Sequence, residues 1–102
     1  MAKQIIIYNL ADNVTDEQYK EFVTKEKGPL LDSLPGVKKF EMVKIMANPG
    51  EQVPYRYIGI LHIDNLGEFG EKAAPSKKFQ DFLQKWTPMA KDPIILMGEE
   101  IY

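Results

Sequence analysis

The chain has 102 residues, of which 44% are hydrophobic and 27% charged, with a formal net charge of −2 at pH 7, and we expect one soluble globular domain over residues 1–102. Acidic residues are interleaved with the lysines, the apolar runs are short, and the N-terminus lacks a hydrophobic core and cleavage site, so we expect no nucleic-acid partner, no membrane contact and no signal peptide. The absence of cysteine excludes disulfides and thiolate sites and, with the other absences, favours a cytoplasmic location.

The first third of the chain predicts a strand followed by an interrupted helix. Residues 3–10, KQIIIYNL, are rich in β-branched side chains and predict the first strand. Thr15 is a suitable helix N-cap, because Gln18 three residues later completes a capping box. Gly28 and Pro29 predict a break or kink, since proline disfavours helical geometry in the residue before it. A further helical turn is expected to begin at Pro29.

The middle of the chain predicts a β-hairpin. A turn at Pro35 and Gly36 leads into a second strand at about 37–46, and residues 55–64, YRYIGILHID, predict the third strand. Between them, NPGE at 48–51 has proline and glycine at the positions that a type II turn favours. We therefore expect the second and third strands to pair with each other.

The last third predicts two helices and a strand. Asn65 can begin a short helix, and Ser76 can cap a stronger one. The stronger helix carries an apolar stripe at helical spacing, formed by Phe79, Phe82, Leu83 and Trp86. Asp92 and Pro93 then lead into the last strand, 94–102.

The resulting order, βαββαβ, predicts an α+β fold of the ferredoxin-like type, with a four-stranded antiparallel sheet and helices on one face. The strands do not alternate cleanly between apolar and polar residues, because residues 5–7 and 94–97 are apolar throughout. Both faces of the sheet should therefore be buried, and a monomer would expose a large apolar patch. We expect a homodimer with C2 symmetry that packs sheet face against sheet face.

The order of elements and the double-sided strands resemble the dimeric α+β barrel superfamily and, within it, the RedY-like (HapK) proteins found with pathways for pyrrole and indole pigments. The matching segments are IIIYNLADNVTDEQY at 5–19, LPGVKKFEMVKI at 34–45, PYRYIGILHIDNLGEFGE at 54–71 and KDPIILMGEEI at 91–101. The resemblance implies a pocket between sheet and helices for a small, flat organic molecule, and pathway chemistry that needs no cofactor. This functional inference is an analogy, because the superfamily is a scaffold with many functions.

The chain departs from related families at one position. Many EthD-like relatives carry a histidine, a small residue and a proline late in the first helix, where this chain has Lys27, Gly28 and Pro29. A lysine serves as a cation, and as a base near neutrality only if its pKa is strongly lowered. The haem-degrading branch uses an Asn, Trp and His trio. Asn9 and Trp86 could correspond to two of these, but the histidine here is on a predicted strand, so we expect no haem chemistry.

His62 is the only histidine and is the candidate catalytic residue. Imidazole is the side chain best matched to proton transfer near neutral pH. The alternative is a buried histidine with a satisfied hydrogen bond and no chemical role. The sequence leaves open which sheet face His62 occupies, because a shift of one residue in strand register moves a side chain to the other face.

Four further residues are candidates for ligand binding: Tyr8, Asn9, Phe82 and Trp86. Tyr8 and Asn9 end the first strand and point to opposite faces, so only one of them can line a given side. Phe82 and Trp86 belong to the apolar stripe, which is either ordinary core or the wall of a pocket between sheet and helices.

Two pairs of residues have less specific predictions. Tyr55 and Tyr57 are expected in the dimer interface, where tyrosine is common. Glu99 and Glu100 face opposite sides and are expected in solvent, although one of them could pair with His62 or a lysine.

The functional hypothesis is a small cofactor-independent enzyme, or a protein that directs a reaction of secondary metabolism, which binds a hydrophobic aromatic intermediate. One alternative is a noncatalytic small-molecule-binding or stress-related dimer. Another is a cofactor-free monooxygenase acting on a substrate that itself reduces dioxygen. With a single histidine and no metal-spaced cluster, we expect no metal site.

Overall fold

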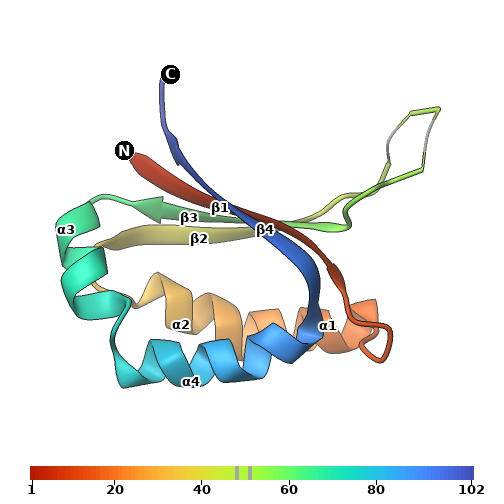
Figure 1. Ribbon diagram of the computed structural model, residues 1–102, viewed down its shortest axis with the longest axis horizontal. Coiled ribbons are helices and arrows are strands. Elements are labelled where there is room, and N and C mark those ends of the chain that lie inside the picture. Colours follow the sequence, from red (N-terminus) through yellow and green to blue (C-terminus); the bar gives the residue numbers. More distant parts are fainter. Residues whose placement is uncertain (48, 51) are drawn as a thin grey trace.

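The computed structural model describes residues 1–47, 49, 50 and 52–102. Four strands form one antiparallel sheet in the order β2-β3-β1-β4. Their bounds are β1 Ala2–Leu10, β2 Val37–Lys44, β3 Tyr57–Ile63 and β4 Ala90–Glu99. All helices lie on one side of the sheet (Figure 1). The predicted βαββαβ arrangement with helices on one face is confirmed.

The first helical connection runs without a break from α1 (Asp16–Phe22) through a π-helical segment η1 (Val23–Lys27) into α2 (Gly28–Asp32). The capping box is confirmed: the backbone N–H of Gln18 donates to Thr15 Oγ1 at 3.1 Å, and the backbone N–H of Thr15 donates to Gln18 Oε1 at 3.0 Å.

A break or kink was predicted at Gly28 and Pro29, and the break is wrong, because the helix widens at this point and continues. The backbone N–H of Gly28 donates to the carbonyl of Val23, five residues back. In such a π turn the backbone N–H bonds to the carbonyl five residues back, where an α-helix would use the carbonyl four residues back, so the turn contains one extra residue. Pro29 lies at the start of α2, where its missing N–H is tolerated. Lys27, the last residue of η1, is buried.

The second helical connection comprises α3 (Leu66–Glu68), the π-helical segment η2 (Phe69–Ala73), α4 (Lys77–Trp86) and the 3₁₀ turn η3 (Thr87–Met89). Both predicted caps are confirmed. The side chain of Asn65 accepts from the backbone N–H of Glu68 at 2.9 Å, and that of Ser76 accepts from the N–H of Phe79 at 3.4 Å.

The last strand begins at Ala90 and contains Pro93, so its predicted start at 94 is wrong. Proline is tolerated there because β4 is an edge strand, and because its pairing with β1 shifts register between Ile7 and Asn9. Asp92, with φ of 51°, lies at this irregularity. The other strands differ from prediction by one or two residues at their ends.

The hairpin of β2 and β3 is confirmed by its antiparallel pairing. Asn48 and Glu51, the end residues of the turn predicted at 48–51, lie outside the described residues. Gly50 has φ of 80°, a left-handed conformation that glycine adopts readily.

The two faces of the sheet differ in their cover. The face toward the helices carries the core, to which the sheet contributes Tyr8, Tyr57, Leu61 and Ile63. Tyr57 is 5% exposed and packs against Tyr8 and Tyr19, so its predicted place in a dimer interface is wrong. The strand pairing that places Tyr57 opposite Tyr8 turns it toward the helices.

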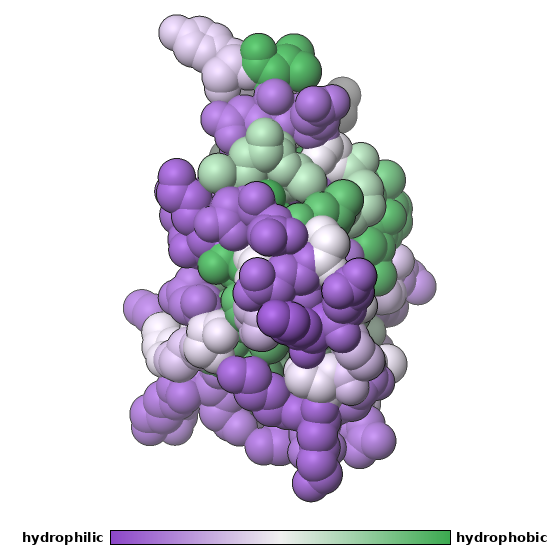
Figure 2. All heavy atoms as spheres, turned by 90° about the vertical axis from the view of Figure 1, so that its left-hand side faces the viewer, coloured by the Kyte–Doolittle hydropathy of each residue, from purple (hydrophilic) through white to green (hydrophobic). Residues whose placement is uncertain are grey.

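The opposite face, which we call the open face, is covered by none of the helices that the described residues form (Figure 1). Its apolar side chains are half-buried or exposed: Ile5, Ile7, Val43, Ile58, Ile60, Ile94 and Leu96. In Figure 2 most of the hydrophobic surface in view lies at the level of the sheet, above the mainly hydrophilic helices. In the described part of the chain, no helix has the length and apolar character needed to cross a membrane.

Candidate functional site

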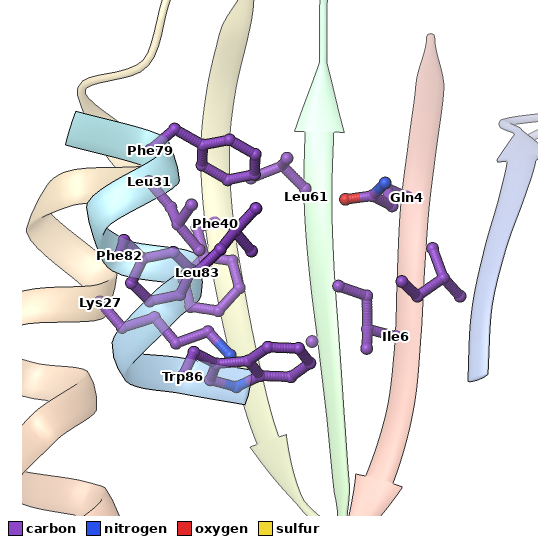
Figure 3. Close-up of a pocket in the computed structure, with 12 residues that line it drawn as sticks. Gln4, Ile6, Lys27, Leu31, Phe40, Leu61, Phe79, Phe82, Leu83 and Trp86 are labelled. Carbon is purple, nitrogen blue, oxygen red and sulfur yellow. The ribbon is translucent and has the colours of Figure 1, made fainter. Parts of the chain in front are cut away.

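A cavity of about 220 Å³ lies between the sheet and the helices. Its walls are mainly apolar and aromatic and include Ile6, Leu31, Leu61, Phe79, Phe82 and Leu83. Trp86 and Lys27 lie together at one end, as Figure 3 shows. The cavity is larger than the apolar cavity of about 150 Å³ that is sufficient to hold benzene in an engineered protein core. A molecule of one or two small rings therefore fits.

Lys27 is the charged side chain among the described residues that line this cavity, and it is only 3% exposed. It reaches the cavity because η1 and α2 place it on the inner side of the helical layer. Its Nζ lies 4.9 Å from the ring centre of Trp86, 5.1 Å from that of Tyr8 and 5.4 Å from that of Phe40. Aromatic rings therefore surround the amine at the end of the cavity.

The amine of Lys27 has no carboxylate partner among the ion pairs of the described residues. Burial disfavours the charged form of the amine, and no carboxylate offsets this effect. The pKa of Lys27 is therefore lowered to about 7. An amine with this pKa can both accept and release a proton near neutrality, the condition under which a lysine can serve as a base.

Two tyrosine hydroxyls hold the amine of Lys27. Its Nζ donates to Tyr8 Oη and to Tyr19 Oη, each at 3.0 Å. The two hydroxyls are hydrogen-bonded to each other, and Trp86 Nε1 donates to Tyr19 Oη at 2.9 Å. Burial raises the pKa of both tyrosines, so their hydroxyls stay protonated.

The number of hydrogens that each group carries determines which group donates each hydrogen bond in this cluster. Tyr19 Oη accepts from Lys27 and Trp86, which leaves its own hydrogen for Tyr8. Tyr8 then donates to Met42 Sδ at 3.3 Å. When Lys27 is neutral, its amine donates both of its hydrogens to the two tyrosine hydroxyls, and its lone pair takes part in no hydrogen bond of this cluster. The arrangement can therefore hold a nucleophilic or basic amine beside an apolar cavity.

The structure brings together three of the five predicted site residues. Phe82 and Trp86 line the cavity, and Tyr8 holds Lys27 from the sheet side. Asn9 points away: its side chain donates to the carbonyl of Pro54 at 3.0 Å and accepts from the N–H of Arg56 at 2.9 Å. Asn9 therefore anchors the chain that leads into β3.

His62 does not line this cavity. In the strand pairing it lies opposite Lys3 and Lys39, on the open face, and its Nε2 is hydrogen-bonded to the carboxylate of Glu41. This hydrogen bond, together with the charge of Lys39, lowers the pKa of Glu41. A catalytic role for His62 stays a prediction, and it would require a ligand on the open face.

Sequence reasoning did not propose Lys27 as a site residue, although a signal was present. Lys27 lies eight residues after Tyr19 and four after Val23, on the same apolar stripe of the helix. A lysine on the buried side of a helix requires either a partner or a function.

No metal-binding cluster is formed by the residues that the structure describes: no three or more His, Asp or Glu side chains gather in a way that could hold an ion. Every buried side-chain nitrogen or oxygen in this part of the chain has a hydrogen-bond partner. The polar side chains that the described residues contribute to the lining of the cavity are Lys27, which two tyrosine hydroxyls hold, and Gln4.

Several solved structures share the fold. HapK from Hahella chejuensis is 21% identical, with a TM-score of 0.77 over 99% of this chain and 93% of that one. A hydroxynitrile lyase from Passiflora edulis is 12% identical, with a TM-score of 0.81 over 99% of this chain and 95% of that one. A dimeric ferredoxin-like protein from Thermobifida fusca is 17% identical, with a TM-score of 0.75 over 97% of this chain and 90% of that one. At these identities the likeness concerns the fold.

The fold class is thus α+β of the ferredoxin-like type, as predicted, and neighbours with this fold include proteins described as dimeric. No curated protein matches the chain in sequence. The family model described as REDY-like protein HapK matches residues 2–101, nearly the whole chain. The chain belongs to the family of REDY-like HapK proteins.

Proposed function

We propose that this protein binds a small, flat, aromatic molecule in the cavity between sheet and helices and promotes a cofactor-independent reaction of it by proton transfer. The observation that carries the proposal is the position of Lys27, a buried amine held by two tyrosine hydroxyls at the end of an apolar cavity. Apolar walls with a few convergent polar groups and a perturbed pKa are the common features of small-molecule sites.

We propose a role in the biosynthesis of pyrrole- or indole-type pigments, as the resemblance to RedY-like (HapK) proteins implies, and the match to this family is what supports the proposal. The hydroxynitrile lyase among the neighbours is an enzyme on the same fold. We propose that residues 1–102 act as one domain, in the cytoplasm, without a bound cofactor or metal. A noncatalytic binding protein is the second candidate. The observation that favours it is that Lys27 Nζ and both tyrosine hydroxyls already have hydrogen-bond partners within the protein.

We also propose that the protein is a homodimer that buries its open face against a second copy. Two exposed side chains on its two edge strands, Leu96 on β4 at 48% and Val43 on β2 at 45% exposure, give a monomer apolar surface that soluble proteins usually cover. The description of a structural neighbour as dimeric supports this assembly. The cavity lies on the other side of the sheet, so a dimer of this kind leaves it free.

Trp86 makes the binding proposal directly testable. It is the only tryptophan, so its indole N–H gives one signal in a ¹H–¹⁵N spectrum, and it lines the cavity. We expect this signal to shift in a saturable manner on titration with unlabelled indole, pyrrole or benzyl alcohol. A Trp86 signal that does not shift with any of the three compounds would contradict the proposal.

A matched pair of variants locates the binding. Ile6→Phe fills the cavity from the sheet side, whereas Ile7→Phe places the same ring on the open face. Only Ile6→Phe is expected to abolish the shift of the Trp86 signal. Chemical analysis of the ligand after incubation with the wild-type protein distinguishes the two functions. An enzyme would convert the ligand, whereas a binding protein would shift the Trp86 signal and leave the ligand unchanged.

A further inference from the structure

We propose that Lys27 is a nucleophile that forms an imine with the carbonyl carbon of an aromatic aldehyde or ketone bound in the cavity. The inference rests on the proposed function and deepens it, because it names the substrate class and the bond that forms. The observations that carry it are the place of the amine, its hydrogen bonds, its charge balance and the rings around it.

The first observation is geometric. The Nζ of Lys27 donates to Tyr8 Oη and Tyr19 Oη, each at 3.0 Å, and the same side chain lines the cavity. Figure 3 shows its nitrogen beside the Trp86 ring, at the end of the cavity. Because a neutral amine has two hydrogens and both are used on the tyrosines, its lone pair is available to a bound electrophile.

The second observation concerns charge. Burial without a carboxylate partner lowers the pKa of Lys27 to about 7, so about half of the amine is neutral at that pH. Lys85 on α4 is the opposite case. Its Nζ donates to Glu26 Oε1 at 2.9 Å, and this hydrogen bond raises its pKa. Near neutrality the amine of Lys27 is therefore more nucleophilic than that of Lys85.

The chemistry balances without an oxidant or reductant. The lone pair of Nζ forms a bond to the carbonyl carbon, and the carbonyl oxygen takes up a proton to give a carbinolamine. The nitrogen supplies this proton and later a second one to the departing oxygen. The hydroxyls of Tyr8 and Tyr19, which are already protonated, hold the nitrogen by hydrogen bonds and do not have to accept a proton. The C–O bond then breaks and one water leaves, so amine plus carbonyl compound yields imine plus water.

The surroundings also suit the product. A protonated imine is a flat cation, and the faces of Trp86, Tyr8 and Phe40 lie 4.9 to 5.4 Å from the nitrogen. Aromatic faces attract cations at such distances. The apolar walls limit the access of water, which would hydrolyse the imine. A bound imine withdraws electrons from the neighbouring carbon and so activates the ligand for proton transfer or for attack by a second molecule.

Reductive trapping with benzaldehyde tests the inference. The folded wild-type protein is treated at pH 7 with benzaldehyde and sodium cyanoborohydride, which reduces iminium ions, and the sites of modification are located by peptide mass spectrometry. A trapped lysine gains the mass of the aldehyde less one oxygen atom. We expect Lys27 to be modified at least about tenfold faster than the exposed lysines.

Three controls make the result specific. Benzyl alcohol has nearly the same shape without the carbonyl, and it should slow trapping at Lys27 and not at the α-amine of Met1. Lys27→Met and Lys27→Gln remove the amine and should abolish the fast phase, whereas Lys20→Met removes an exposed lysine from α1 and should leave it unchanged. Should neither Lys27 variant fold, the position of the adduct in the wild type decides.

The outcomes separate this inference from the proposed function. Fast trapping at Lys27 that benzyl alcohol blocks supports both. A shift of the Trp86 signal by both compounds, without an adduct at Lys27, overturns the imine and leaves the binding function standing. No shift and no adduct overturns both.

Discussion

The amine nitrogen of Lys27 lies 3.0 Å from the hydroxyl oxygen of Tyr8, across the boundary between the helical layer and the sheet. Tyr8 is completely buried, and its ring stacks on Tyr57 with the ring centres 5.9 Å apart. The hydrogen bond thus joins an ionisable group on the helices to the aromatic part of the core. Both the stability and the chemistry of the protein should depend on the charge of Lys27.

The stability of the protein should rise with pH above neutrality because of Lys27. Its pKa is about 7 in the folded chain and 10.5 as its ordinary value, so the unfolded chain binds more protons between these values. The free energy of unfolding should therefore increase by roughly 2 kcal/mol between pH 7 and pH 9. Urea denaturation at several pH values measures this increase. In Lys27→Met the increase should disappear, and a wild-type stability independent of pH would refute the prediction.

Tyr19→Phe should destabilise the protein by about 1–3 kcal/mol, because its hydroxyl accepts from both Lys27 and Trp86 and the variant leaves two buried donors with fewer partners. Tyr55→Phe is the matched control. Because Tyr55 is only half-buried, this variant should lose little stability. Denaturation curves of the two variants compare the effects. Equal losses would mean that the buried hydroxyl contributes no more than a surface one.

Leu96→Lys should disrupt the proposed dimer, since each subunit would then bury a charge in an apolar interface. We expect a loss on the order of 3 kcal/mol, about a hundredfold in Kd. Leu66→Lys is the control: Leu66, on α3 and outside the open face, is 53% exposed, compared with 48% for Leu96. Light scattering across a dilution series reports the assembly. A wild-type monomer at micromolar concentration would disprove the dimer.

His62→Gln should leave ligand binding in the cavity unchanged, because His62 is on the open face with Glu41. The shift of the Trp86 signal on titration with indole measures binding, and light scattering detects any change in the dimer. Turnover lost while both binding and assembly persist would instead support the catalytic role predicted for His62. The same titration of Lys27→Met provides the comparison.

Local sequence patterns predicted most of the fold. The capping residues Thr15, Asn65 and Ser76 act through contacts three residues away, so short-range spacing is sufficient to identify them. The last strand was predicted to begin at 94, although it begins at Ala90, because a proline usually ends or precedes a strand. Whether proline is tolerated depends on the edge position of β4, which is a property of the whole sheet.

The candidate site could be predicted only in part. Phe82 and Trp86 follow from helical periodicity, since a stripe that packs on a sheet also borders any cavity between them. The face of His62 could not be predicted, because strand register decides it and a shift of one residue reverses it. The place of Lys27 on the buried side of the helix had a sequence signal, but its lowered pKa and its hydrogen bonds could not be predicted, because they depend on residues that are distant in the sequence, such as Tyr8 and Trp86.

The sequence by itself determined the order of the elements, their caps and the apolar character of both sheet faces, since each depends on residue type and on spacing along the chain. The tertiary structure alone decided that Tyr8 and Tyr19 meet Lys27, and that His62 lies on the other side of the sheet. The physical reason is that burial and hydrogen bonding set the charge of an amine. Both arise only when the helices pack on the sheet.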